Sequence, residues 1–104
     1  MKQYNKLIRD KIPEIIQAEG RKCTVEVLSD EDYLFHLNKK LVEEVNEYAE
    51  SNDVEELADL EEVLRAILDA KGVDYNSFEE IRLNKVNKRG AFKKKLLLKV
   101  NKSN

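Results

Sequence analysis

Residues 29–72 specify the main architecture and read SDEDYLFHLNKKLVEEVNEYAESNDVEELADLEEVLRAILDAKG. Its apolar residues recur every three or four positions in two runs, which are separated by a short polar break at residues 51–53. Ser29 and Asp53 stand where helix N-caps are favoured, and the Lys-Gly pair at residues 71–72 ends the second run. The pattern predicts two long amphipathic helices, and a connection this short makes them antiparallel neighbours.

The segments on either side of this hairpin predict shorter elements. A short helix is expected over residues 13–19, whose proline suits the first helical position, and a third helix over residues 77–89, whose first residue is a capping serine. Residues 22–28 alternate apolar and polar side chains, as strands do, and residues 92–100 are a candidate partner strand. The predicted fold class is mainly α, with the antiparallel helical hairpin as its core and a small two-stranded β-sheet as a possible addition.

Length and composition limit what the chain can build. With 104 residues, 41% hydrophobic and 38% charged, it has room for one domain, and a helical core of this size is often completed by a second copy. We therefore expect a homodimer or higher homo-oligomer, with a frayed tail at residues 101–104. The net charge of −2, from 19 basic and 21 acidic residues, predicts no partner, but the acids concentrate mid-chain and the bases at both ends.

Several classes of protein are argued against by the residues that carry special chemistry. The one cysteine, Cys23, excludes an internal disulfide framework and fits a reducing cytoplasm. We see no signal peptide and no apolar run that would cross a bilayer, so a cytoplasmic protein without membrane contact is expected. His36 has no histidine or cysteine partner at ligand spacing, which argues against zinc. The lysines at 93–95 lack interleaved aromatic residues, so no nucleic-acid partner is expected.

Carboxylates occupy unusual positions on both helices of the hairpin. At about 100° per residue, Glu44 falls inside the apolar arc of the first helix and Glu47 just beyond its edge, whereas Glu43 points away. Glu56 and Asp59 both fall inside the apolar arc of the second helix, which must face the first. Each helix therefore presents two carboxylates, spaced i, i+3 and adjacent on its surface, at or near the interface.

An acidic residue on a helix usually marks no more than a solvated surface, but buried like charges are costly. The repulsion can be offset by protonation, by salt bridges to a buried lysine or arginine, or by a hard divalent cation. Oxygen ligands without histidine or cysteine suit Mg²⁺, with Mn²⁺ as a substitute. Glu56 also stands three residues after Asp53, so a purely structural capping-box role is open to it.

The spacing of these acids is similar to a known signature. Residues 43–47, EEVNE, and 56–59, ELAD, resemble the E-E-x-x-E … E-x-x-D motif of the all-α nucleoside triphosphate pyrophosphohydrolases, the MazG-like superfamily. Two flanking segments resemble those of a subgroup of short chains that are labelled phosphoribosyl-ATP pyrophosphohydrolase-like. They are residues 4–13, YNKLIRDKIP, and residues 88–92, KRGAF. The resemblance covers nearly the whole chain and implies a fold of the all-α NTP pyrophosphatase type.

The same resemblance implies a reaction, the Mg²⁺-dependent hydrolysis of a nucleoside triphosphate to a monophosphate and pyrophosphate. Its implied metal ligands are Glu44, Glu47, Glu56 and Asp59, with Glu43 as a lesser participant. The ions would neutralise phosphate charge and lower the pKa of a bound water that attacks phosphorus. A spare carboxylate would act as base, with Glu43, Glu44 and Glu47 as the catalytic candidates. Removal of unwanted or noncanonical nucleotides is the expected role.

Basic residues at both ends of the chain suit phosphate oxygens that a metal does not reach. On the third predicted helix, two lysines share the face of Phe78 and Ile81 and an arginine borders them. The substrate-binding candidates are Lys6, Arg9, Lys11, Lys85, Lys88 and Arg89. Ordinary surface charge, or salt bridging to the acids, explains each of them equally well.

Two other functions stay open. One is true phosphoribosyl-ATP hydrolysis, which we disfavour because the chain shows no feature specific to that bulky substrate. The other is a catalytically silent helical module that binds a nucleotide or a protein partner. Metal dependence distinguishes an enzyme from such a module, because the enzyme should lose turnover in an Asp59→Asn variant, whereas a silent module should keep its function.

Overall fold

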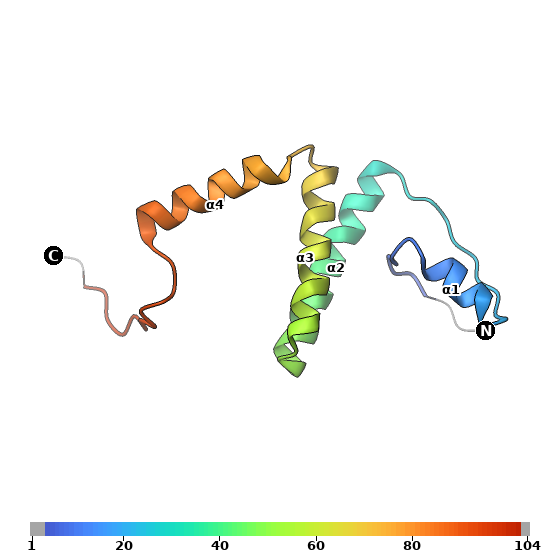
Figure 1. The fold of residues 1–104 in the computed structure, drawn as a ribbon, viewed down its shortest axis with the longest axis horizontal. Coiled ribbons are helices and arrows are strands. Elements are labelled where there is room, and N and C mark those ends of the chain that lie inside the picture. Colours follow the sequence, from blue (N-terminus) through green and yellow to red (C-terminus); the bar gives the residue numbers. More distant parts are fainter. Residues whose placement is uncertain (1–3, 103–104) are drawn as a thin grey trace. The chain divides into compact units, whose positions relative to one another are not determined.

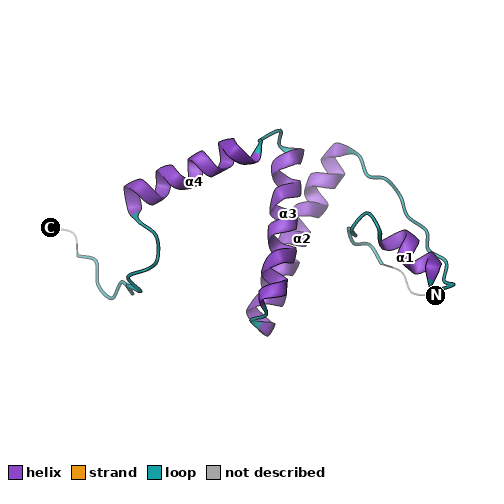
Figure 2. Ribbon diagram, in the orientation of Figure 1, coloured by secondary structure: helices purple, strands orange, loops and turns teal. Residues whose placement is uncertain are grey.

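The computed structural model describes residues 4–102, and these contain four helices and no strand. The helices are α1 (Ile12–Ala18), α2 (Asp30–Ser51), α3 (Val54–Ala70) and α4 (Tyr75–Arg89), shown in Figures 1 and 2. The mainly α fold class is confirmed. The chain divides into two compact units, Met1–Val73 with α1 to α3 and Asp74–Asn104 with α4. Within the described residues, no helix is both long and apolar enough to span a membrane.

Helices α2 and α3 form the predicted hairpin and lie side by side (Figure 1). Each begins at the predicted cap. Ser29 Oγ accepts the N–H of Asp32 over 3.2 Å, and Asp53 Oδ1 accepts the N–H of Glu55 over 3.0 Å. Between the helices, Asn52 adopts a left-handed φ of 57°, a conformation that asparagine tolerates better than most residues. The chain therefore reverses direction within a very short connection.

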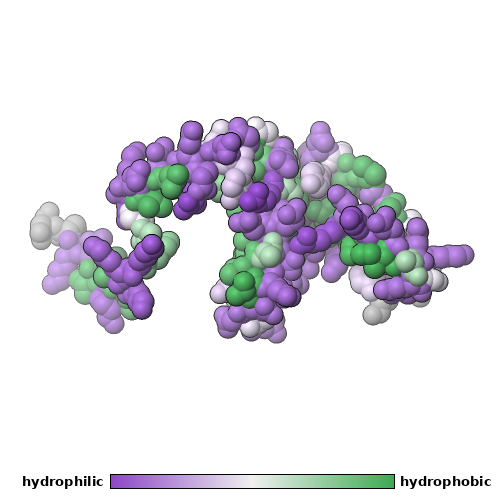
Figure 3. Space-filling model, in the orientation of Figure 1, coloured by the Kyte–Doolittle hydropathy of each residue, from purple (hydrophilic) through white to green (hydrophobic). Residues whose placement is uncertain are grey.

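The buried core of the hairpin is small. Leu37 of α2, 2% exposed, meets Val63 and Ile67 of α3. Around this centre pack the partly buried residues Leu7, Tyr33, Leu34, Leu41 and Ala66. Other apolar side chains of the same two helices remain accessible, and Figure 3 shows apolar groups reaching the surface in separate patches. The apolar faces of the hairpin are therefore only partly covered within the unit that contains α1 to α3.

The prediction of a small two-stranded sheet is wrong for the described residues. Neither 22–28 nor 92–100 is a strand, and Val27 and Phe92 are 99% and 97% exposed. In the second segment the N–H of Lys95 bonds to the carbonyl of Phe92 over 3.2 Å, which closes a turn where the strand was expected. Alternating polarity shows that a segment suits a sheet, but a strand also needs a neighbour that accepts its hydrogen bonds.

The third predicted helix begins earlier than expected, because its cap is Asp74 rather than Ser77. One carboxylate oxygen of Asp74 accepts the Ser77 N–H over 2.9 Å, and the other accepts the Ser77 hydroxyl over 3.0 Å. The bond from the Ser77 backbone, followed by that from its side chain, lowers the pKa of Asp74. Gly90 ends the helix as predicted, at a φ of 85°. Of the expected frayed tail, residues 103–104 lie outside the described residues, and residues 101–102 are irregular.

Candidate metal centre

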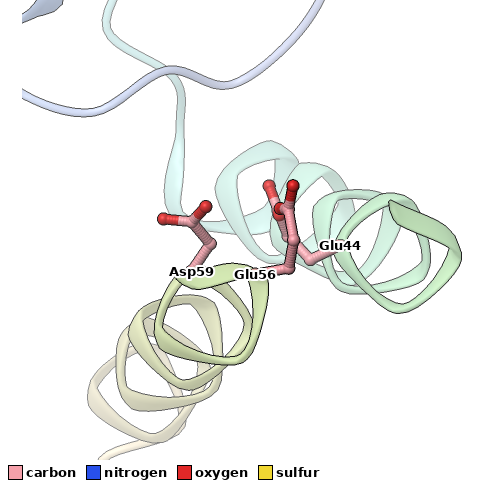
Figure 4. Close-up of side chains that lie close together, drawn as sticks. All are labelled: Glu44, Glu56 and Asp59. Atoms are coloured by element: carbon pink, nitrogen blue, oxygen red, sulfur yellow. The ribbon is translucent and has the colours of Figure 1, made fainter. Parts of the chain in front are cut away.

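Three predicted ligands converge between the two helices of the hairpin. Glu44 of α2 and Glu56 and Asp59 of α3 each offer one carboxylate oxygen, and these oxygens lie within 4.8 Å of one another (Figure 4). Glu56 and Asp59 share a face of α3 because they are three residues apart, and the packing of α2 against α3 places Glu44 opposite them. We call these three residues the carboxylate cluster.

Glu44 is the buried member of the cluster, with 6% of its surface exposed. Its Oε1 lies 3.7 Å from the Nζ of Lys40, one turn earlier on α2. Its Oε2 is buried and finds no hydrogen-bond partner among the described residues. Burial raises the pKa of Glu44, the negative charges of Glu47 and Asp59 raise it further, and the charge of Lys40 works against them. A buried carboxylate oxygen without a partner is unfavourable and favours the binding of a proton or a cation.

Glu56 has the same electrostatic character from the other side of the interface. Its pKa is raised by burial first, and then by the charges of Glu47 and Asp59. Glu47 is exposed, and its negative charge raises the pKa of both Glu44 and Glu56. The four predicted ligands therefore influence one another directly. Perturbed carboxylates on facing helices are typical of sites that hold protons or metal ions.

The capping-box alternative for Glu56 is not present in the structure. The N–H of Asp53, which such a box would assign to the Glu56 side chain, instead donates to Ser51 Oγ over 3.1 Å. The side chain of Asp53 accepts from Glu55. The start of α3 is therefore satisfied without the Glu56 carboxylate, which lies near those of Glu44 and Asp59.

The N-terminal segment brings two predicted phosphate-binding residues to the carboxylates of the hairpin. Arg9 Nη2 lies 2.6 Å from Asp59 Oδ1 on α3, and Lys6 Nζ lies 3.7 Å from Glu43 Oε1 on α2. Leu7, between the two cations in sequence, packs against the hairpin core and anchors the segment. Exposed pairs of this kind typically contribute no more than about 1 kcal/mol each.

Lys40 was not among the residues predicted from the sequence. Its Nζ lies 3.5 Å from Glu43 Oε1 as well as 3.7 Å from Glu44 Oε1, and only 18% of its side chain is exposed. The sequence does contain a signal for these contacts, because Lys40 stands three and four residues before Glu43 and Glu44 on one helix. Salt bridges therefore offset part of the repulsion, but Glu47 and Glu56 have no ion pair within residues 4–102.

The remaining cationic candidates all have exposed side chains. Lys11 is exposed at the start of α1. Lys85, Lys88 and Arg89 are exposed on α4, which belongs to the second unit. The last two lie in the final turn of α4, where the helix dipole favours cations whatever their function. A role of these four residues toward phosphate stays a prediction.

Comparison with known proteins adds little to this geometry. No family model and no solved structure matches the chain. An uncharacterized protein of Mycolicibacterium smegmatis is 51% identical over 41 residues, which cover 39% of this chain and 42% of that protein. The matched part thus spans less than half of this curated relative. Functional conclusions must come from the residues and the site.

Proposed function

We propose that the protein is a Mg²⁺-dependent nucleoside triphosphate pyrophosphohydrolase that acts on the nucleotide pool of the cytoplasm. The observation that supports this most is the carboxylate cluster, whose oxygens lie within 4.8 Å of one another and whose Glu44 has one buried oxygen without a partner among the described residues. Its donor atoms are all carboxylate oxygens, which fits Mg²⁺ or Mn²⁺. The resemblance of the acidic motif to the MazG-like superfamily supports the reaction class.

In this proposal Glu44, Glu56 and Asp59 hold the ion. Bound Mg²⁺ supplies positive charge for the phosphate oxygens and makes water more acidic. Water attacks the α-phosphorus, the bond from that phosphorus to the oxygen bridging it to the β-phosphorus breaks, and pyrophosphate leaves with that oxygen. Glu47 is exposed beside the cluster, so it is the carboxylate that we assign as acceptor of the water proton. Lys6 and Arg9, at the ends of the anchored segment, are placed to exchange a carboxylate partner for a phosphate oxygen.

The proposal includes a second copy of the chain. Val45 and Leu57 belong to the predicted apolar faces of the hairpin, yet they are 45% and 40% exposed. Two hairpins packed against each other would cover such side chains, and burial of apolar surface favours this association. We therefore propose a homodimer or a higher homo-oligomer built through the hairpins.

Release of pyrophosphate from a panel of canonical and modified nucleoside triphosphates tests the proposed reaction. We expect release with Mg²⁺, none with EDTA, and a loss of at least about 100-fold in Glu56→Gln, because outer-shell changes alone cost metal sites 10–100-fold. Glu62→Gln is the matched control, since Glu62 is an exposed glutamate of the same helix outside the cluster. Failure with every triphosphate contradicts the proposal. Phosphoribosyl-ATP is then the next substrate to test, and a second failure favours the silent binding module.

A further inference from the structure

A pocket of about 370 Å³ lies between the N-terminal segment and α2, next to the carboxylate cluster. Its titratable lining residues are Lys6, His36, Lys39, Lys40 and Glu43. Three lysines and a histidine thus surround a single carboxylate. The size is at the small end of ligand sites, which typically measure about 300–1,000 Å³. The lining favours a compact anion.

The charges of the lining are not balanced within the pocket. Lys6 and Lys40 both approach Glu43 Oε1, at 3.7 and 3.5 Å, so one carboxylate serves two cations. Lys39 Nζ lies 5.6 Å from the ring centre of Phe35 and has no carboxylate partner in the described part of the chain. An aromatic ring attracts a cation but does not neutralise its charge, so the ammonium group can still attract an anionic ligand. The pocket therefore retains positive charge after its internal ion pairs are formed.

Lys40 connects the pocket to the carboxylate cluster. Its Nζ contacts Glu43, which lines the pocket, and lies 3.7 Å from Glu44 Oε1, which belongs to the cluster. An anion in the pocket and a cation in the cluster would therefore be separated by a single side chain. Asn5 and Asn46 also line the pocket, and their carboxamides offer neutral hydrogen-bond donors to anionic oxygens.

We propose that this pocket binds the diphosphate group that the reaction releases, with Lys39 and His36 as contacts that the acidic motif does not include. The inference rests on the proposed function, because it names the place of the leaving group in that site. Diphosphate is compact, carries several negative charges, and accepts hydrogen bonds from ammonium, imidazole and amide groups alike. Lys39 is the residue to substitute, because substitution of Lys6 or Lys40 would also break ion pairs with carboxylates of the hairpin.

Titration of the full chain with inorganic pyrophosphate, in buffer freed of metal by a chelating resin, tests the inference without turnover. We expect shifts of amide NMR signals confined to the lining residues, and about tenfold weaker binding in Lys39→Gln, as the loss of one charge-assisted bond would give. Lys71→Gln, at the exposed end of α3, should bind like the wild type, and Lys39→Arg should restore binding. Circular dichroism verifies that the variants remain helical.

Several outcomes overturn the inference. They are an absence of pyrophosphate binding, equal weakening in Lys39→Gln and Lys71→Gln, or adenosine without phosphate shifting the same signals. The result is separable from that of the proposed function. Turnover without pyrophosphate binding removes the role of the pocket and leaves the proposed reaction. Pyrophosphate binding without turnover on any triphosphate removes the proposed reaction and leaves a pocket that binds diphosphate.

Discussion

Glu44 is the buried charged residue of the described chain, and its electrostatics make a prediction about stability and pH. A folded pKa raised above the unfolded value of 4.5 means that the folded state binds the proton more tightly. The favourable contribution of protonated Glu44 to the free energy of unfolding is therefore fully present below pH 4.5. It is lost as the pH rises through the folded pKa. In metal-free buffer at neutral pH we expect Glu44→Gln to be more stable than the wild type, with the gain vanishing in acid. Urea unfolding at several pH values measures this, and a less stable Glu44→Gln at neutral pH contradicts it.

Mg²⁺ should reverse that order. A ligand that binds only the folded state at about 100 times its dissociation constant adds about 2.7 kcal/mol to the free energy of unfolding. We expect the wild type to gain this amount at neutral pH and Glu44→Gln to gain much less, because an amide oxygen is a weaker ligand than a carboxylate. The same urea titrations with and without Mg²⁺ provide the measurement. Equal gains in both proteins would place the ion elsewhere.

At the scale of elements, the hairpin depends on caps that its sequence specifies locally. Ser29 accepts the N–H of Asp32, so Ser29→Ala should lower the free energy of unfolding by about 1 kcal/mol, the usual loss for an N-cap. Ser29→Asp is the matched control, because aspartate caps equally well and should preserve stability. Urea unfolding compares the three proteins. Identical midpoints for Ser29→Ala and the wild type would mean that the cap contributes nothing.

The start of α4 offers a second test at this scale. Asp74 accepts both hydrogen bonds of Ser77, so Asp74→Ala should reduce helix content more than Ser77→Ala, which keeps the backbone bond. The pKa of Asp74 is lowered below 3.8, so its contribution is present above pH 3.8 and disappears as the pH falls through the folded pKa. Far-ultraviolet circular dichroism over an acid titration reads both effects. A larger loss in Ser77→Ala would restore the cap predicted from the sequence.

The elements also show which features a sequence can predict. Periodicity and capping are local properties, so the hairpin and the inward positions of Glu44, Glu56 and Asp59 follow from residue order. The two strands fail because pairing depends on a partner segment, which local alternation does not specify. The start of α4 differs because two good capping residues stand three positions apart, and the carboxylate accepts both available bonds. Lys40 and the basic pocket depend on where the N-terminal segment lies against α2, which no local pattern contains.

At the scale of the whole molecule, the exposed apolar residues of the hairpin predict self-association. Val45 and Leu57 remain 45% and 40% exposed, so we expect a dimer or a larger assembly in analytical ultracentrifugation. The double variant Val45→Glu/Leu57→Glu should shift the protein toward the monomer. Ile15→Glu, at a 48% exposed position on α1, is the control and should leave the assembly unchanged. A wild-type monomer at all concentrations rules out the proposed pairing of hairpins.

We propose that the carboxylate cluster between α2 and α3 is a site for a hard divalent cation. The most direct measurement is Mn²⁺ binding followed by electron paramagnetic resonance, with Mg²⁺ as competitor, in the wild type, Glu56→Gln and Glu62→Gln. Saturable Mn²⁺ binding that Mg²⁺ displaces, weakened at least about tenfold in Glu56→Gln and unchanged in Glu62→Gln, is the predicted result. An absence of saturable binding, or equal binding by all three proteins, would contradict the claim and remove the structural support for the proposed reaction.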